Sequence, residues 1–303
     1  MSLLLLGPPE RGAVWSGIFR AAGEELVLGE AAVADPAAIT HLACWEPPAD
    51  LGIYPNLRVV LSVGAGVDQM PALPAGVRLA RTLAPGIEAM MRDWTVMAVL
   101  ALHRDLPAYL EKARRGDWQP GTTLPASARR VGIMGMGRIG RLSAEALTGL
   151  GFKVSGWSRS GRPVASVTMH GEGELPRFLA STDILVCLLP LTDDTRGIID
   201  GRLLAALPAG ARFAHAGRGG HLDMVALRQA LDSGRLTGAM LDVTDPEPLP
   251  AEHWLWRHPR AIVTPHVGAH TDAVEGARHA LAVIDADRRA LPLPGLVDPA
   301  RGY

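Results

Sequence analysis

Three charged side chains in the last third of the sequence could bind a carboxylate and transfer a proton. Arg218, Glu247 and His266 each come shortly after an apolar run that predicts a β-strand. A guanidinium can hold a carboxylate through two hydrogen bonds and polarise a neighbouring carbonyl. A carboxylate paired with an imidazole favours the charged imidazole, which can then deliver a proton. Each residue alone could be an ordinary loop or structural residue, so the hypothesis depends on the combination.

A glycine-rich turn near the middle of the chain predicts a dinucleotide site. It follows the apolar run 131–134, precedes the helix-patterned stretch 141–150, and a second strand is expected at 152–157. In a βαβ unit the three glycines allow a tight turn, close approach of a pyrophosphate and helix–strand packing, and the phosphates lie at a helix N-terminus. A purely structural turn is the alternative. The turn consists of Gly135, Met136, Gly137, Arg138, Ile139 and Gly140.

The residues after that second strand favour NADP over NAD. An NAD site usually has an acidic residue there for the ribose hydroxyls, whereas this chain has Ser158, Arg159 and Ser160. A guanidinium beside small hydroxyls suits a 2′-phosphate. The alternative is that Arg159 is a solvated surface residue.

Composition excludes several classes of protein. The chain has 303 residues, is 48% apolar and has a net charge of −1, so it can bury the cores of two domains and has no basic field for nucleic acid or membranes. Cys44 and Cys187 lie in apolar runs, which indicates buried free thiols in a reducing compartment. We expect a cytoplasmic protein, and without a Cys/His cluster of metal-ligand spacing we expect no metal requirement.

The alternation of short apolar runs with helix-patterned stretches predicts the α/β class, with two Rossmann-like domains, doubly wound parallel sheets and a cleft between them. A substrate domain is expected at 1–97 plus 271–303, and a dinucleotide-binding domain at 98–270. A helical segment at 87–115, interrupted near Pro107, would bridge them, and a last helix at 271–291 would return to the first domain. The expected strands are 3–6, 25–28, 41–44, 57–63 and 77–80, then 131–134, 153–157, 183–188, 212–215, 238–243 and 261–264.

Together these elements resemble the D-2-hydroxyacid dehydrogenase family over nearly the whole chain. The matching segments are Gly64-Ala65-Gly66-Val67-Asp68, the glycine turn, Leu188-Leu189-Pro190-Leu191-Thr192, Arg218-Gly219, Leu241-Asp242-Val243 through Glu247-Pro248-Leu249-Pro250, and Pro265-His266. A narrower resemblance is to the NADP-preferring glyoxylate/hydroxypyruvate reductase branch. It is carried by Trp157-Ser158-Arg159-Ser160, Cys44-Trp45-Glu46-Pro47-Pro48, Trp118-Gln119-Pro120 and Thr264-Pro265-His266-Val267.

The resemblance implies reduction of a small 2-oxo acid, glyoxylate or hydroxypyruvate, with NADPH preferred and NADH possible. Arg218 would bind the substrate carboxylate and keto oxygen, His266 would donate the proton, and Glu247 would orient and charge the imidazole. The resemblance further implies that Trp45, Ala65 and Gly66 bind the substrate. The implied cofactor residues are the glycine turn, Ser158, Arg159, Ser160, Leu189, Pro190, Ala216, Asp242, His266 and Gly268.

Several alternatives stay open at this point. Trp45 could be an ordinary core residue, residues 64–67 only a tight turn, and Asp242 a loop cap. The enzyme could be another family member, of the D-lactate or phosphoglycerate type, or the chain a nucleotide-sensing scaffold without turnover. The resemblance also implies a homodimer, with the segment 106–128 packing across a two-fold axis.

Two departures from the family pattern bear on the pocket. His215 stands where many members have asparagine, and Asp93-Trp94 stands where many have Glu-Tyr. His215 could be an additional acid/base, but its place in an apolar strand favours a buried, hydrogen-bonded histidine.

Overall fold

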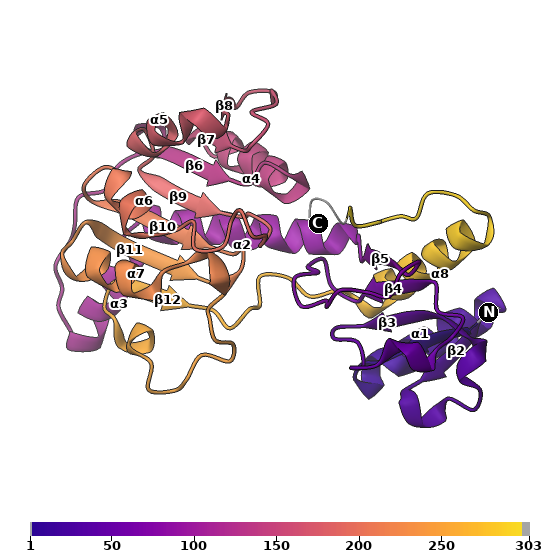
Figure 1. Cartoon of the computed structure of the whole chain (residues 1–303). Helices are drawn as coiled ribbons and strands as arrows, with labels where there is room; N and C mark the ends of the chain where they lie inside the picture. Colours follow the sequence, from indigo (N-terminus) through magenta and orange to yellow (C-terminus); the bar gives the residue numbers. More distant parts are fainter. Residues whose placement is uncertain (1, 299–303) are drawn as a thin grey trace. The chain divides into compact units, whose positions relative to one another are not determined.

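The computed structural model describes residues 2–298 and divides the chain into two compact units (Figure 1). Unit 1 contains Met1–Ile87 and His270–Tyr303, and unit 2 contains Glu88–Ala269. Residue 1 and residues 299–303, which belong to the expected substrate domain, lie outside the described residues. The first boundary between the units falls in the first turn of helix α2 (Pro85–His103). The boundary expected from the sequence, after residue 97, falls inside this helix, which continues there without a break.

Unit 1 is built on a five-stranded parallel sheet in the order β2-β1-β3-β4-β5. This is the flavodoxin-like order. All residues of β1 and β4 are buried, because the central strands of a parallel sheet are covered on both faces. The five strands expected in this part of the chain are confirmed, with ends that differ by one or two residues. They are β1 (Ser2–Leu5), β2 (Glu25–Leu28), β3 (Ile39–Cys44), β4 (Val59–Ser62) and β5 (Arg78–Arg81).

Two helices, α1 (Pro9–Ala22) and α8 (Ala273–Arg288), share one core cluster with this sheet. Trp15 and Phe19 of α1 pack in that cluster with Ile284 of α8. The αL residue Gly23 (φ 70°) ends α1, and the Asp272 carboxylate caps the start of α8. The opposite face has its own core cluster, to which the 3₁₀ segment η3 (Leu51–Ile53) contributes. Two further short 3₁₀ segments belong to unit 1, η1 (Glu30–Ala32) and η2 (Pro36–Ala38).

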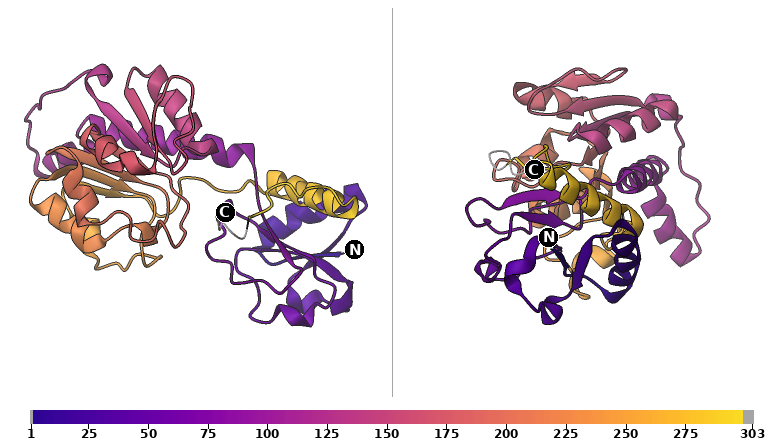
Figure 2. Two further views of the ribbon diagram at one scale, coloured as in Figure 1. Left: turned by 45° about the horizontal axis from the view of Figure 1, so that its top comes forward. Right: turned by 90° about the vertical axis from the view of Figure 1, so that its right-hand side faces the viewer.

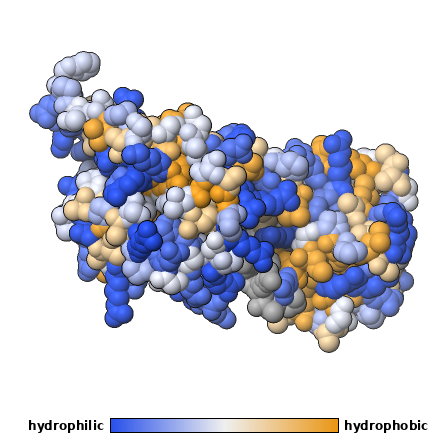
Figure 3. Space-filling view, turned by 90° about the horizontal axis from the view of Figure 1, so that it is seen from above, coloured by the Kyte–Doolittle hydropathy of each residue, from blue (hydrophilic) through white to orange (hydrophobic). Residues whose placement is uncertain are grey.

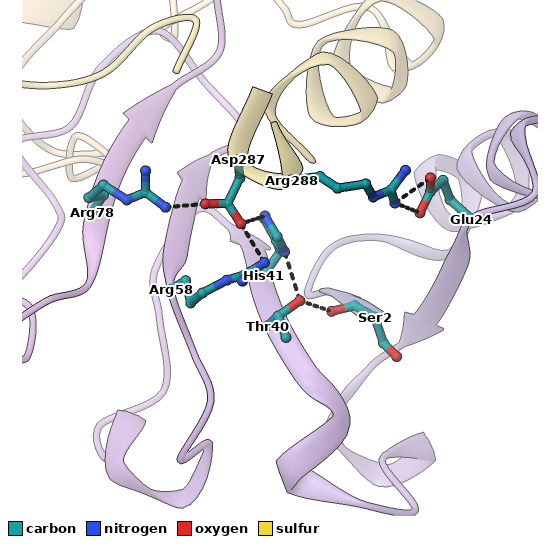
Figure 4. Close-up of polar contacts among 8 residues, drawn as sticks. All are labelled: Ser2, Glu24, Thr40, His41, Arg58, Arg78, Asp287 and Arg288. Carbon is teal, nitrogen blue, oxygen red and sulfur yellow. Dashed lines mark hydrogen bonds and ion pairs between the residues drawn. The ribbon is translucent and has the colours of Figure 1, made fainter. Parts of the chain in front are cut away.

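A buried carboxylate fastens the end of α8 to the amino ends of the strands (Figure 4). Asp287, whose side chain is 4% exposed, lies 2.5 Å from Arg58 Nη2 and 3.3 Å from His41 Nε2, and it also pairs with Arg78. Burial lowers the pKa of His41 to about 4, against the opposing attraction of Asp287, so the imidazole is neutral. Removing one partner from a buried ion group costs about 3–5 kcal/mol. The chain segment that returns from unit 2 is therefore held at the edge of the sheet remote from the strand carboxyl ends.

Unit 2 is built on a seven-stranded parallel sheet in the order β12-β11-β10-β9-β6-β7-β8. Counted from β6, this is the doubly wound dinucleotide-binding order with one further strand, and the order reverses between β6 and β9. The two sheets confirm the predicted fold class. The seven strands are β6 (Arg130–Met134), β7 (Lys153–Trp157), β8 (Thr168–His170), β9 (Ile184–Cys187), β10 (Ala211–His215), β11 (Leu236–Leu241) and β12 (Ala261–Val263).

The prediction of six strands in this part of the chain is wrong by one, because β8 is not in it. Only three residues long, Thr168-Met169-His170, β8 pairs with β7 at the sheet edge. A segment of three residues is too short to contain an apolar run. An edge strand pairs with a neighbour on one side only, so it does not need such a run.

Helices cover both faces of this sheet, and Figure 2 shows the layers from two further directions. Trp94 and Leu102 of α2 share one core cluster with Leu147 of α4 (Arg138–Gly149). The other cluster contains residues of α5 (Leu175–Ala180), α6 (Gly201–Ala206) and α7 (Met224–Asp232). The 3₁₀ segments of unit 2 are η4 (Ala126–Ala128), η5 (Glu172–Glu174), η6 (Gly219–His221) and η7 (Trp254–Arg257).

The expected interruption of the long helix lies between α2 and α3 (Leu106–Arg115). Asp105 has φ 54° at the break and pairs with the buried Arg212, while Pro107 lies in the first turn of α3. As predicted, Cys44 and Cys187 are buried free thiols. Nowhere in residues 2–298 is a helix both long and apolar enough to cross a membrane.

Candidate active site

Glu247 and His266 form a hydrogen-bonded pair in the loops that follow β11 and β12. His266 Nδ1 lies 2.7 Å from Glu247 Oε2, and Glu247 Oε1 accepts a 2.9 Å hydrogen bond from the Thr244 N–H. About a third of each side chain is exposed within the described structure, 36% for His266 and 35% for Glu247. Because Nδ1 is engaged by Glu247, Nε2 is the ring nitrogen that can exchange a proton with a ligand.

The electrostatics of this pair favour the charged form of both groups. The hydrogen bond that His266 donates to Glu247 raises the pKa of His266, although burial and the charge of Arg218 act in the opposite direction. Burial by itself would raise the pKa of Glu247, but the hydrogen bonds from His266 and Thr244 outweigh it and lower that pKa. The imidazolium–carboxylate form therefore persists to a higher pH than an isolated histidine would allow.

A buried carboxylate shapes the loop that carries His266. The backbone of His266 has φ 52°, an uncommon conformation for a residue with a side chain, which costs about 1–3 kcal/mol. Asp242, 2% exposed, accepts hydrogen bonds from Thr264 Oγ1 (2.6 Å), Val267 N–H (3.0 Å) and Gly268 N–H (2.9 Å). These contacts bracket His266 on both sides and hold the loop in this conformation. Both Asp242 carboxylate oxygens serve this role.

Arg218 follows β10 in a loop whose glycines allow close approach to its neighbours. A Cβ at Gly219 would lie 2.0 Å from the carbonyl oxygen of Thr244, so the Arg218 loop packs directly against the loop of Glu247. The charge of Arg218 influences the pKa of both Glu247 and His266. The structure of unit 2 thus brings the three sequence-predicted chemical groups into one electrostatic neighbourhood.

The glycine turn between β6 and α4 fits a dinucleotide. Gly135 has φ 103°, and a Cβ there would lie 2.6 Å from the Leu188 carbonyl oxygen; a Cβ at Gly140 would lie 2.1 Å from the Gly135 carbonyl oxygen. A Cβ at Gly137 would meet nothing within 4 Å, which is the space that a phosphate needs next to the backbone. No side chain caps the start of α4 at Gly137, so its first N–H groups suit an anion. The Arg138 guanidinium pairs with Glu88 at 2.6 Å.

The remaining sequence-predicted cofactor residues lie at the carboxyl ends of neighbouring strands. Ser158, Arg159 and Ser160 follow β7, and Arg159 Nη1 lies 2.9 Å from Asp194 Oδ2, with both side chains substantially exposed. Leu189 and Pro190 follow β9, Ala216 follows β10, and the Gly268 N–H binds Asp242. This is the edge of a doubly wound sheet at which ligands bind.

The expected substrate residues Trp45, Ala65 and Gly66 belong to unit 1, where they follow β3 and β4. Trp45 is 44% exposed within the described structure, so the alternative that it is an ordinary core residue is wrong. A Cβ at Gly64 would lie 2.8 Å from Trp45, and the Gly66 carbonyl accepts a hydrogen bond from Ser62 Oγ. The turn at 64–67 is thus tight and packs closely against Trp45.

His215 is a buried, hydrogen-bonded histidine, as favoured from the sequence. It is fully buried, its Nε2 lies 2.9 Å from the Arg218 carbonyl oxygen, and burial lowers its pKa to about 3. The fold also gathers Cys187, His215 and His221, each of which has one potential ligand atom within 4.8 Å of the others. Their separation in sequence conceals this cluster. The absence of a metal requirement remains a prediction.

The supporting roles of Thr244, Thr264 and His221 were not found from the sequence. Each acts through a backbone or side-chain hydrogen bond that depends on loop geometry, which the motifs that contain Thr244 and Thr264 do not reveal.

Comparison with known proteins gives the family. The family model described as D-isomer specific 2-hydroxyacid dehydrogenase, NAD binding domain, matches residues 96–268. The chain is also 36% identical, over the full length of both sequences, to glyoxylate/hydroxypyruvate reductase A of Salmonella newport (strain SL254). This chain belongs to the D-isomer specific 2-hydroxyacid dehydrogenase family. The family assignment made from sequence motifs is confirmed, and the protein is an NAD(P)-dependent oxidoreductase with 2-hydroxyacid dehydrogenase activity.

Solved structures of this dehydrogenase family share the fold over the whole chain. A D-isomer specific 2-hydroxyacid dehydrogenase from Xanthobacter autotrophicus Py2, in complex with NADPH and MES, is 34% identical with a TM-score of 0.93, covering 100% of this chain and 99% of that one. An NADPH-dependent glyoxylate/hydroxypyruvate reductase from Sinorhizobium meliloti, in complex with NADP and sulfate, is 38% identical with a TM-score of 0.90 and the same coverage.

The pairing of Glu247 with His266 predicts the effect of Glu247→Gln in this dehydrogenase. The substitution removes the negative charge that raises the pKa of His266, so that pKa should fall. Protonated His266 would then be lost at lower pH than in the wild type. NMR titration of the labelled imidazole would measure the shift. Glu252→Gln, on the exposed surface of the same segment, is the matched control. An unchanged His266 titration in Glu247→Gln would refute the pairing.

Proposed function

We propose that this protein reduces a short 2-oxo acid, glyoxylate or hydroxypyruvate, to the corresponding 2-hydroxy acid with NADPH, and that His266 donates the proton. The observation that carries the proposal is the 2.7 Å hydrogen bond between Glu247 and His266, which yields an oriented, charged imidazole beside Arg218. The reductase names of the Salmonella and Sinorhizobium relatives support the substrate class.

In this mechanism each of three side chains has a separate role at the substrate carbonyl. Arg218 binds the substrate carboxylate and stabilises negative charge that develops on the carbonyl oxygen. Nε2 of His266 delivers a proton to that oxygen, while Glu247 holds Nδ1 and stabilises the charged ring before transfer. The nicotinamide cofactor, when bound, supplies the hydride. Trp45, Ala65 and Gly66 are proposed as further substrate-binding residues.

We place the cofactor along the strand carboxyl ends of unit 2. Gly135, Gly137 and Gly140 would receive the pyrophosphate at the start of α4. Ser158, Arg159 and Ser160 would receive the 2′-phosphate of NADP. Further contacts are proposed for Met136, Arg138, Ile139, Leu189, Pro190, Ala216, Asp242, His266 and Gly268. For Asp242 the contact is through the loop that its carboxylate organises.

Kinetics with glyoxylate, hydroxypyruvate, pyruvate and phenylpyruvate test the proposed reaction. With NADPH, kcat/KM should be highest for glyoxylate or hydroxypyruvate, and Arg218→Ala and His266→Ala should each lower it by at least about a hundredfold, because each removes a charge-stabilising or proton-donating group. Preference for pyruvate or phenylpyruvate would move the protein to a different branch of the family. Oxidation of NADPH with none of these acids would instead favour a nucleotide-sensing scaffold.

The proposed role of Arg159 is tested by its removal. Arg159→Ala should lower kcat/KM with NADPH by about tenfold or more and change kcat/KM with NADH little, because only NADP has the phosphate that the guanidinium would bind. Arg177→Ala, an exposed arginine on α5, is the control. Equal losses with the two cofactors would show that Arg159 does not select between them.

We also propose that the protein is a homodimer that pairs through α2, α3 and the following segment. The face drawn in Figure 3 alternates hydrophilic side chains with apolar patches. An apolar groove in unit 2 is lined by α2, by the start of α3 and by the end of α4. Arg92, Asp93 and Arg104 place charges of both signs along this groove, which suits pairing with a second copy of the chain. Exposed apolar side chains here are Met97, Leu100, Leu106, Leu110, Trp118, Leu124 and Leu150.

Light scattering should therefore give twice the chain mass of 32.1 kDa. Leu106→Glu combined with Leu110→Glu should give a monomer, because two charges would be buried without partners. Val225→Glu, at a 66% exposed position on α7, should leave the dimer intact. A wild-type monomer at micromolar concentration would exclude this proposal.

A further inference from the structure

Two buried histidines bind the main chain of Arg218, one at its carbonyl oxygen and one at its N–H. His215 Nε2 lies 2.9 Å from the Arg218 carbonyl oxygen, and the Arg218 N–H donates a 3.0 Å hydrogen bond to His221 Nδ1. Both imidazoles are 0% exposed. Side chains thus bind both peptide groups that flank the Cα of Arg218, in the loop that follows β10, and the Arg218 carbonyl also accepts a 3.0 Å hydrogen bond from the His221 N–H.

The hydrogen bonds indicate which ring nitrogen of each histidine donates and which accepts. His221 Nδ1 accepts from an N–H, so it carries no proton, and its Nε2 donates to the Pro190 carbonyl oxygen at 3.1 Å. His215 Nε2 faces a carbonyl oxygen, so it must donate. His221 is therefore neutral, and His215 is neutral because burial lowers its pKa to about 3; one ring accepts from the Arg218 backbone and the other donates to it. Neither has a ring nitrogen exposed for acid–base chemistry.

We infer that His215 and His221 are positioning residues that fix the backbone of Arg218 and thereby aim its guanidinium at the substrate. The inference deepens the proposed function and rests on it. A displacement of about 1 Å in a substrate-binding group can cost about a hundredfold in rate, so a rigid backbone at this position has a direct effect on turnover. Through Pro190, His221 also ties the Arg218 loop to the loop after β9, next to the glycine turn.

The surroundings of the two rings leave them little freedom. A Cβ at Gly217 would lie 2.9 Å from His221 Nδ1, so only glycine allows the imidazole to approach the backbone this closely. His215 stacks on Phe213 at 5.5 Å and meets His221 edge-on at 5.6 Å between ring centroids. Packing thus fixes the ring planes, and the hydrogen bonds fix the distance to Arg218.

A metal ion held by Cys187, His215 and His221 is the competing interpretation of the same cluster. It fits the contacts less well, because both nitrogens of His221 already bind backbone groups.

Two nearly isosteric substitutions of His215 test the inference. Gln can still donate to the Arg218 carbonyl, whereas Met fills the same space and cannot. We expect His215→Gln to keep kcat/KM within about threefold of wild type and His215→Met to lower it by about tenfold or more, mainly through KM for the 2-oxo acid. The Kd of NADPH should stay within about twofold in both.

A double-mutant cycle separates positioning from a general structural role. In an Arg218→Ala background, His215→Met should cause no further loss of kcat/KM, because its effect passes through the guanidinium. An equal loss in both backgrounds, or equal activity of His215→Met and wild type, would overturn the inference. If His215→Met does not fold, the pair His221→Leu and His221→Asn replaces it, with Asn expected to retain activity as an acceptor.

Two further measurements keep this inference distinct from the proposed function. If the wild type reduces none of the four acids, the proposed reaction fails, and oxalate binding in the presence of NADP then reports on the aim of Arg218. In that case His215→Met should bind oxalate at least about tenfold more weakly than His215→Gln; equal affinities would overturn the positioning role. Stoichiometric metal in the purified protein, found by elemental analysis, would also overturn it.

Discussion

The hydrogen bond between His266 Nδ1 and Glu247 Oε2 determines the tautomer, the orientation and the charge of the imidazole together. Each property alone would be insufficient, because a proton donor must be protonated and must also direct the correct nitrogen at the substrate. The pair is only partly exposed, so the attraction between its charges is screened less than on an open surface. The arrangement of β11, β12 and their loops is what brings these two side chains within 2.7 Å.

The geometry of this pair depends on hydrogen bonds among the residues that surround the loop of His266. His266 has an unfavourable backbone conformation, and the hydrogen bonds of Asp242 to Thr264, Val267 and Gly268 compensate for it. Thr264 Oγ1 in turn accepts a 3.0 Å hydrogen bond from Trp94 Nε1 of α2. A chain of hydrogen bonds therefore runs from α2 to the loop of His266, the proposed proton donor. The departure from the family pattern at Asp93-Trp94 falls on a residue that braces this loop.

Much of the fold could be predicted because periodicity reflects burial. Central strands such as β9 are buried on every residue and appear as unbroken apolar runs, whereas β8 has no such run. The glycine turn was predictable for a similar reason, since the close approaches of Gly135 and Gly140 exclude any side chain.

The support of the candidate site was harder to predict. Asp242 and His221 act on backbone groups, and any segment of the chain can offer those. Their partners are chosen by how two loops pack, which depends on long-range strand order. Sequence spacing likewise concealed the meeting of Cys187 with His215 and His221, because neighbouring strands β9 and β10 bring them together.

His266 and His215 differ in charge because their surroundings differ. His266 lies beside a carboxylate at a partly open position, so its charged form is stabilised. His215 lies within the sheet, where burial and a second imidazole disfavour any charge, and its pKa falls to about 3. A neutral ring cannot compete with His266 for the proton, and it places no additional positive charge next to Arg218. In the proposed reaction, the carboxylate-binding charge and the transferable proton are thus on separate residues, which would allow Arg218 to stay charged while His266 changes its protonation state.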